Sequence, residues 1–117
     1  MNGAKRWYFA DGYLDIGKGN NRTSHESLCI LNANEEEANI KLQVFFSDKE
    51  PISFTLKVPP MRDIHVRMDL LGLPYETPYG IKIESDITVV SQLSRMSIND
   101  EGFSLMTTTG CWENDNE

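Results

Sequence analysis

The chain of 117 residues has no long apolar run. No stretch approaches the roughly 18 consecutive apolar residues that a membrane-spanning helix needs. Lys5, Arg6 and Asp11 interrupt the first 14 residues, which therefore lack the apolar segment of a secretory signal peptide. We therefore expect a cytoplasmic protein.

Patterns typical of metal centres and active sites are also missing. Cys29 and Cys111 are the two cysteines, and two cysteines so far apart do not indicate a disulfide framework. The sequence has neither the CxxC nor the HxxxH spacing of zinc sites. It also lacks the GxSxG motif of serine hydrolases and a glycine-rich phosphate loop between a strand and a helix. These absences favour a protein that is not an enzyme and holds no metal or other cofactor.

Positively charged residues are fewer than negatively charged ones. The chain has 11 Lys and Arg against 18 Asp and Glu, for a net charge of -7. An acidic surface repels phosphate backbones, so the net charge makes nucleic acid an unlikely partner. The length suits one domain with one core, which we expect over residues 1–112. Residues 113–117 are polar and acidic, which predicts a disordered tail.

What the sequence does contain is a repeated alternation of apolar and polar residues. Ile52, Phe54 and Leu56, for example, alternate with polar residues. A strand turns successive side chains to opposite faces, so this period of two predicts strands with one buried face. The predicted strands cover residues 7–10, 27–31, 40–46, 52–58, 64–68, 81–84, 87–94 and 104–110.

Turn residues separate these runs by short connections, which implies antiparallel neighbours. About eight short antiparallel strands predict an all-β sandwich, jelly roll or barrel. One turn of helix is expected over residues 68–72, before Pro74.

Polar residues at strand ends are candidates for a binding site. His25 and Glu26 precede the second predicted strand and could bind a metal, move a proton or hold a ligand hydroxyl. They could equally satisfy backbone groups at the strand end. Asn32 ends that strand and could bind a ligand or close a turn. A metal site made of His25, Glu26 and His65, as in a cupin-like enzyme, is a further alternative.

Other candidates share strand faces. His65 and Arg67 lie two residues apart on one face and could bind an anion or a partner subunit, or simply face solvent. Gln92 shares a face with Ser94, whereas Arg95 lies on the opposite face. The aromatic residues near the termini suit a core or a subunit contact, or stacking on a sugar or base. They are Trp7, Tyr8, Tyr13 and Trp112.

Several segments together resemble the sensory rhodopsin transducer family. They are residues 10–13 (ADGY), 24–32 (SHESLCILN), 45–51 (FFSDKEP), the set Arg62, His65 and Arg67, and residues 87–95. The resemblance covers roughly residues 7–97. This sequence departs from the family pattern at Asp11, where Glu is expected, and at Leu93, where His is expected.

The resemblance implies an antiparallel β-sandwich of jelly-roll type that forms a homotetramer and has no enzymatic activity. It implies a signal-transducer-like role or the binding of a carbohydrate-like small molecule. It also raises two alternatives, a cytoplasmic partner of a membrane photoreceptor and DNA binding. Because loops and strand ends on a rigid scaffold commonly bind ligands, we expect a site drawn from nine residues. They are His25, Glu26, Asn32, Ser47, Asp48, His65, Arg67, Gln92 and Arg95.

Overall fold

The computed structural model describes residues 3–16, 24–99 and 102–115. Its strands are β1 (Ala4–Tyr13), β2 (His25–Asn32), β3 (Ala38–Phe45), β4 (Ile52–Val58), β5 (Arg62–Arg67), β6 (Pro78–Asn99), β7 (Gly102–Thr109) and β8 (Cys111–Glu113). A single 3-10 turn, η1 (Met68–Leu70), follows β5 where a helical turn was predicted. The described part of the chain contains no helix capable of spanning a lipid bilayer.

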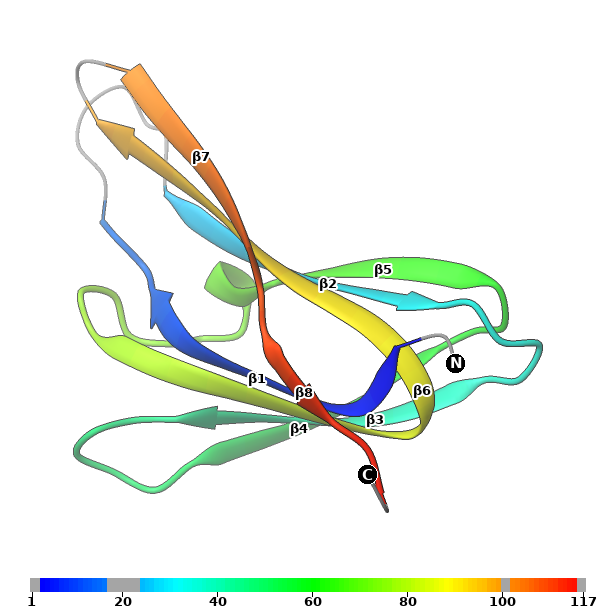
Figure 1. Ribbon diagram of the computed structural model, residues 1–117. Coiled ribbons are helices and arrows are strands. Elements are labelled where there is room, and N and C mark those ends of the chain that lie inside the picture. The colour runs from blue at the N-terminus through cyan, green and yellow to red at the C-terminus, as the bar shows by residue number, and fades with distance from the viewer. Residues whose placement is uncertain (1–2, 17–23, 100–101, 116–117) are drawn as a thin grey trace.

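The strands form two antiparallel sheets that share one member (Figure 1). The first sheet has the order β4-β3-β6-β1-β8, and the second has the order β5-β2-β6-β7. Apolar side chains from both sheets meet in one core, as alternation on half-buried strands requires. The prediction of an all-β antiparallel sandwich with about eight strands is confirmed.

The shared strand is β6, which spans 22 residues. Its first part pairs with β1 and β3, and its later part pairs with β2 and β7. Figure 1 shows it curving from one sheet into the other. Two separate strands, 81–84 and 87–94, were predicted here, and this prediction was wrong. The eighth strand is β8, which the alternation did not reveal because it has only three residues.

β6 is a single strand because its alternation of buried and exposed residues continues in the same phase across the bend. Ile81, Ile83, Val89 and Leu93 are all buried, so the same side of the strand faces the core throughout. At the bend, Asp86 accepts hydrogen bonds of 2.8 Å from both the backbone N–H and the side-chain Nδ2 of Asn39. These bonds lower the pKa of Asp86 and tie the bend to β3.

Trp7 fixes β1 over the core. Its indole N–H donates to the carbonyl oxygens of Ala4 at 3.1 Å and Val89 at 3.0 Å, and the residue is only 5% exposed. Trp112 of β8 lies with its ring centroid 5.9 Å from that of Trp7 but is 60% exposed. Of the terminal aromatic residues, Trp7 therefore belongs to the core.

The C-terminal segment forms an edge of both sheets, because β7 ends the second sheet and β8 ends the first. Glu113 and Asp115 accept hydrogen bonds from Arg6 at 3.0 and 2.8 Å, and Lys5 N–H donates to Asn114. These contacts hold residues 113–115 against β1. Residues 116–117 lie outside the described residues.

Gly110 allows the chain to cross between the sheets. A Cβ atom there would lie 2.5 Å from the carbonyl oxygen of Tyr8 and 2.7 Å from the Phe9 ring. We therefore expect Gly110→Ala to lower the free energy of unfolding by about 1–3 kcal/mol, measured by urea denaturation. Gly80→Ala is the control, because its Cβ would meet nothing closer than 3.5 Å. Equal effects of the two substitutions would contradict this account of the crossing.

Candidate functional site

Strand register brings several polar residues onto the outer face of the second sheet. Cys29 of β2 lies opposite His65 of β5 on one side and opposite Gln92 of β6 on the other. Ser27 lies between Arg67 and Ser94 in the same way. We call this surface the polar face; it consists of His25, Ser27, Cys29, Asp63, His65, Arg67, Gln92, Ser94 and Thr107. Four of the nine predicted site residues therefore share one surface.

Two adjoining recesses lie on the polar face. The larger has a volume of about 340 Å³, and its polar lining includes Asp63, His65, Gln92 and Thr107. The smaller has a volume of about 240 Å³ and extends toward His25. Cys29, His65 and Ser94 line both recesses.

Neighbouring groups already balance much of the charge on this face. His65 Nε2 lies 3.2 Å from Asp63 Oδ2, with both side chains more than half exposed. Arg67 donates two hydrogen bonds to Asp69, of 2.8 and 2.7 Å, and these raise the pKa of its guanidinium. The centre of the face is therefore mainly uncharged, with hydroxyl, amide and thiol groups.

The Cys29 thiol is a poor nucleophile in this setting. Burial raises the pKa of Cys29, which favours the protonated thiol over the reactive thiolate. The described contact of its sulfur is a weak one, to the backbone oxygen of Ser27 at 3.9 Å. The cross-strand neighbours Cys29 and His65 therefore lack the electrostatics of a catalytic pair.

Glu26 and Arg95 lie opposite each other on β2 and β6 and point to the side of the second sheet away from the polar face. Glu26 is fully buried, and its Oε2 accepts a 2.7 Å hydrogen bond from Arg95 Nε. Its Oε1 accepts from the hydroxyl of Tyr79 and from the backbone N–H of Tyr13 at 3.2 Å. Burial and the bond to Glu26 raise the pKa of Tyr79, so its hydroxyl keeps the proton. Arg95 also donates to the backbone oxygen of Asp11 at 2.7 Å, which ties β1, β2 and β6 together.

The predicted metal set is not assembled. Glu26 faces the interior with both carboxylate oxygens engaged, whereas His65 is on the outer face. Within the described ranges no three His, Cys, Asp or Glu residues are grouped so that they could hold a metal ion.

Asn32 closes a turn. Its Nδ2 donates to the backbone oxygens of Glu36 at 2.8 Å, Val58 at 3.1 Å and Pro59 at 3.2 Å. Its Oδ1 accepts two bonds of 3.0 Å from Asn34. Because the residue is fully buried and its amide is engaged at both ends, the structure supports the turn alternative.

Ser47 and Asp48 lie apart from the polar face, in the turn between β3 and β4 of the first sheet. Both are exposed. In the same turn, the Lys49 ammonium lies 4.5 Å from the centroid of the Phe46 ring. The structure therefore divides the nine predicted residues among the polar face, the interior and two turns.

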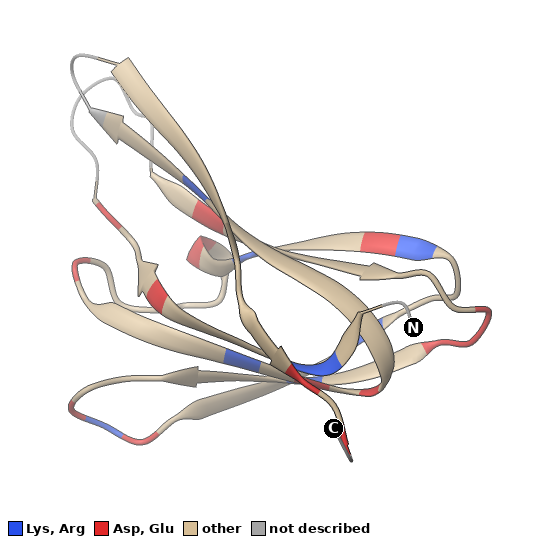
Figure 2. Ribbon diagram, in the orientation of Figure 1, with Lys and Arg blue, Asp and Glu red and all other residues tan. Residues whose placement is uncertain are grey.

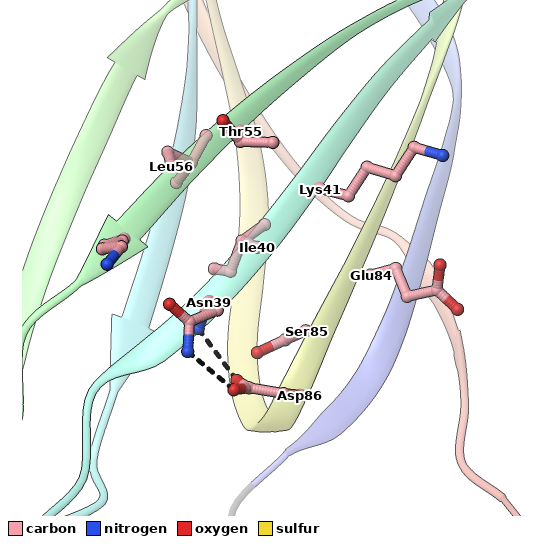
Figure 3. A pocket seen from close by; sticks show the side chains of 9 residues that line it. Asn39, Ile40, Lys41, Thr55, Leu56, Glu84, Ser85 and Asp86 are labelled. Carbon is pink, nitrogen blue, oxygen red and sulfur yellow. Dashed lines mark hydrogen bonds between the residues drawn. The ribbon is translucent and has the colours of Figure 1, made fainter.

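The first sheet carries a larger recess of about 710 Å³ beside the bend of β6 (Figure 3). Ile40, Leu56 and Ser85 lie along it, and the hydrogen-bonded pair Asn39 and Asp86 closes one end. Both oxygens of Asp86 are used by Asn39, so this carboxylate is already committed to the fold. We assign no ligand to this recess.

Sequence reasoning missed several members of the polar face, notably Ser27, Cys29 and Asp63. Ser27 and Cys29 alternate with buried residues of β2, and Asp63 lies two residues before His65. The period-two pattern could have placed them on this face, but only strand pairing shows that the three strands are neighbours.

The comparisons with known proteins agree with this architecture. A profile of the family described as Anabaena sensory rhodopsin transducer matches residues 2–112. The chain belongs to this family. The solved structure of Thermotoga maritima 1070 is 45% identical, with a TM-score of 0.92 over 97% of this chain and 98% of that one. The Anabaena sensory rhodopsin transducer itself is 36% identical, with a TM-score of 0.66 over 76% of this chain and 91% of that one. No match was found among the curated proteins compared.

The departure from the family pattern at Leu93 falls on the inner side of β6. Leu93 is only 2% exposed and belongs to the hydrophobic core. Its neighbours Gln92 and Ser94 point to the opposite side and lie on the polar face.

We expect Asn32→Ala to lower the free energy of unfolding by about 3 kcal/mol, because buried backbone carbonyls lose their donors. Asn39→Ala, which removes the exposed side-chain hydrogen bond to Asp86 and keeps the backbone one, should cost about 1 kcal/mol or less. Urea denaturation measures both. A loss of ligand affinity without a loss of stability in Asn32→Ala would contradict the turn assignment.

Arg95→Ala should also be strongly destabilising, by about 3 kcal/mol, because it leaves the buried Glu26 carboxylate without its counter-charge. Arg6→Ala is the control: Glu113 and Asp115, the acidic partners of Arg6, are both more than half exposed, so solvent compensates their charge and the loss of stability should be clearly smaller. Thermal and urea unfolding of both variants test this difference. An Arg95→Ala variant as stable as Arg6→Ala would show that the buried pair contributes little.

Proposed function

We propose that the chain is a non-enzymatic, signal-transducer-like module that acts as a homotetramer and binds a carbohydrate-like small molecule on the polar face. The observation that carries this proposal is the convergence of His65, Gln92 and Thr107, from three different strands, on one recess. Family membership supports the transducer-like role.

The chemistry of the polar face suits a polyol. Sugar hydroxyls both donate and accept hydrogen bonds, and amide and hydroxyl side chains such as Gln92, Ser94 and Thr107 do the same. The pair His65 and Asp63 adds an acceptor at the rim. The volume of about 340 Å³ is at the lower end of the range for small-molecule sites, which fits a ligand of monosaccharide size.

The same residues argue against catalysis as the role of this face. The raised pKa of Cys29 disfavours a thiolate. Glu26, the buried carboxylate behind the face, is held by Tyr79 and Arg95 rather than offered to a substrate.

A second candidate function is signalling from a membrane receptor, acting in the cytoplasm. It is supported by the 36% identity to a protein named as a sensory rhodopsin transducer. DNA binding has less support, because acidic and basic residues are interleaved along the described ribbon (Figure 2). Arg6, for example, pairs with Glu113 and Asp115. A phosphate backbone needs a continuous basic surface.

Isothermal titration calorimetry against a panel of monosaccharides and disaccharides tests ligand binding. We expect one class of sugar to bind and Gln92→Ala to weaken its binding by about tenfold, the loss expected when a polar partner is removed. Gln43→Ala is the control, since Gln43 lies on β3 of the other sheet. No heat of binding from any sugar, or equal losses in the two variants, would rule out this site.

A further inference from the structure

β8 is a short, exposed strand at the edge of the first sheet. Its three residues, Cys111–Glu113, pair with Arg6, Trp7 and Tyr8 of β1 (Figure 1). All three are exposed, so the core does not depend on them. The preceding strand β7 has a partner of its own in β6, and β8 can therefore leave β1 without separating β7 from its sheet. Short strands with few buried contacts open locally at a low cost in free energy.

The side-chain contacts that hold the C-terminal segment on β1 are mainly ion pairs in contact with solvent. Arg6 donates hydrogen bonds to Glu113 at 3.0 Å and to Asp115 at 2.8 Å. The Lys5 ammonium lies 3.7 Å from Asp115. Both carboxylates are more than half exposed, and ion pairs in such a setting contribute little to stability. Another acidic segment can therefore replace this one at a small cost.

Basic side chains of β1 and β6 give this edge its preference for carboxylates. The pKa of Glu113 is lowered by a hydrogen bond from Tyr8 and, next, by one from Arg6. The nearby ammonium of Lys82 on β6 adds to this effect, so the edge binds the ionised carboxylate. Lys5, Arg6 and Lys82 are three of the 11 Lys and Arg residues in a chain whose net charge is -7. Three cations gathered on one edge of an acidic chain favour an acidic occupant.

The backbone of β1 determines the shape of that occupant. β1 has ten residues, of which β8 covers three. An extended peptide added to such an edge gains affinity from main-chain hydrogen bonds and specificity from alternate side chains. The Trp112 ring centroid lies 5.9 Å from that of Trp7, which shows that an aromatic residue fits beside the basic cluster. Residues 112–115 (WEND) therefore display the pattern that this edge accepts, an aromatic residue followed by two alternating acids.

We infer that the outer edge of β1 is a docking site for an extended acidic peptide of another protein, and that β8 occupies this site as an intramolecular competitor. The peptide pairs with β1 as an added strand, places its carboxylates on Lys5, Arg6 and Lys82, and releases β8. A tethered segment competes at an effective concentration in the millimolar range, so a peptide must match both the aromatic residue and the acids to displace it. The docking site lies on the first sheet, apart from the polar face of the second.

Fluorescence anisotropy of a labelled peptide with the sequence of residues 110–115 tests the docking site on the full-length chain. The double substitution Glu113→Gln and Asp115→Asn weakens the chain's own segment, so the peptide should bind it about tenfold more tightly than it binds the unmodified chain. Glu35→Gln with Glu37→Gln is the matched control. It removes two exposed charges from the turn between β2 and β3, where Glu37 lies 3.6 Å from Lys57 in an exposed ion pair, and it should leave peptide binding unchanged.

The role of the basic cluster is tested in the same assay. Adding Arg6→Ala to the Glu113→Gln and Asp115→Asn variant should weaken peptide binding by about tenfold, as should replacing the acids of the peptide with Gln and Asn. Equal peptide affinity in the two double variants, or affinity that survives Arg6→Ala, overturns the inference. Competition by short single-stranded DNA at an equal concentration would show a general anion site and overturns it as well.

Nuclear magnetic resonance of the unmodified chain gives a readout that needs no variant. At saturating peptide the Trp112 indole signal should move to the position of an unpaired tryptophan. The Trp7 indole N–H, which is hydrogen-bonded in the core, should stay protected from exchange. A peptide that binds while the Trp112 signal stays in place is bound elsewhere, which contradicts the inference. A lower assembly mass in the Glu113→Gln and Asp115→Asn variant would show that β8 joins copies of the chain instead, and this outcome also overturns it.

Discussion

The continuity of β6 is the constraint on which the rest of the molecule depends. One strand supplies a hydrogen-bonded partner to β1 and β3 in the first sheet and to β2 and β7 in the second. Its bend is held from both sides, by Asn39 on Asp86 and by a 2.7 Å hydrogen bond from Asn34 to the backbone oxygen of Thr88. Because the inner positions of β6 stay buried through the bend, Gln92 and Ser94 are fixed on the outer face by the same packing that forms the core.

The sequence was sufficient for the fold class and for the positions of most strands, because alternation over half-buried strands records which face is inside. It was not sufficient for the pairing, which depends on contacts between distant residues. Ser85 and Asp86 resembled a break between strands, although they form a bend within one strand. For the same reason the site was predicted only in part. His65 and Gln92 were identified singly, but Cys29, which lies between them, was not.

The predicted residues that turned out to have structural roles show a second limit of sequence reasoning. Glu26, Asn32 and Arg95 are polar side chains near strand ends, and such residues suit a ligand or a structural role equally well. Only the hydrogen-bond partners of these side chains distinguish a ligand-binding role from a structural one. Glu26 is surrounded by Arg95, Tyr79 and the N–H of Tyr13, and Asn32 by backbone groups of a turn. A buried group whose hydrogen bonds are all satisfied within the chain has little left to offer a ligand.

The proposed ligand binding and the proposed homotetramer are connected thermodynamically. Leu105 and Thr107 of β7 line recesses of the polar face, so a ligand bound there would contact the strand at the edge of the second sheet. A ligand that binds the assembled form more tightly than the single chain must strengthen assembly by the same factor, because the two equilibria are linked. If the proposed ligand binds the assembled form with the higher affinity, this linkage converts the binding of a small molecule into a change of assembly.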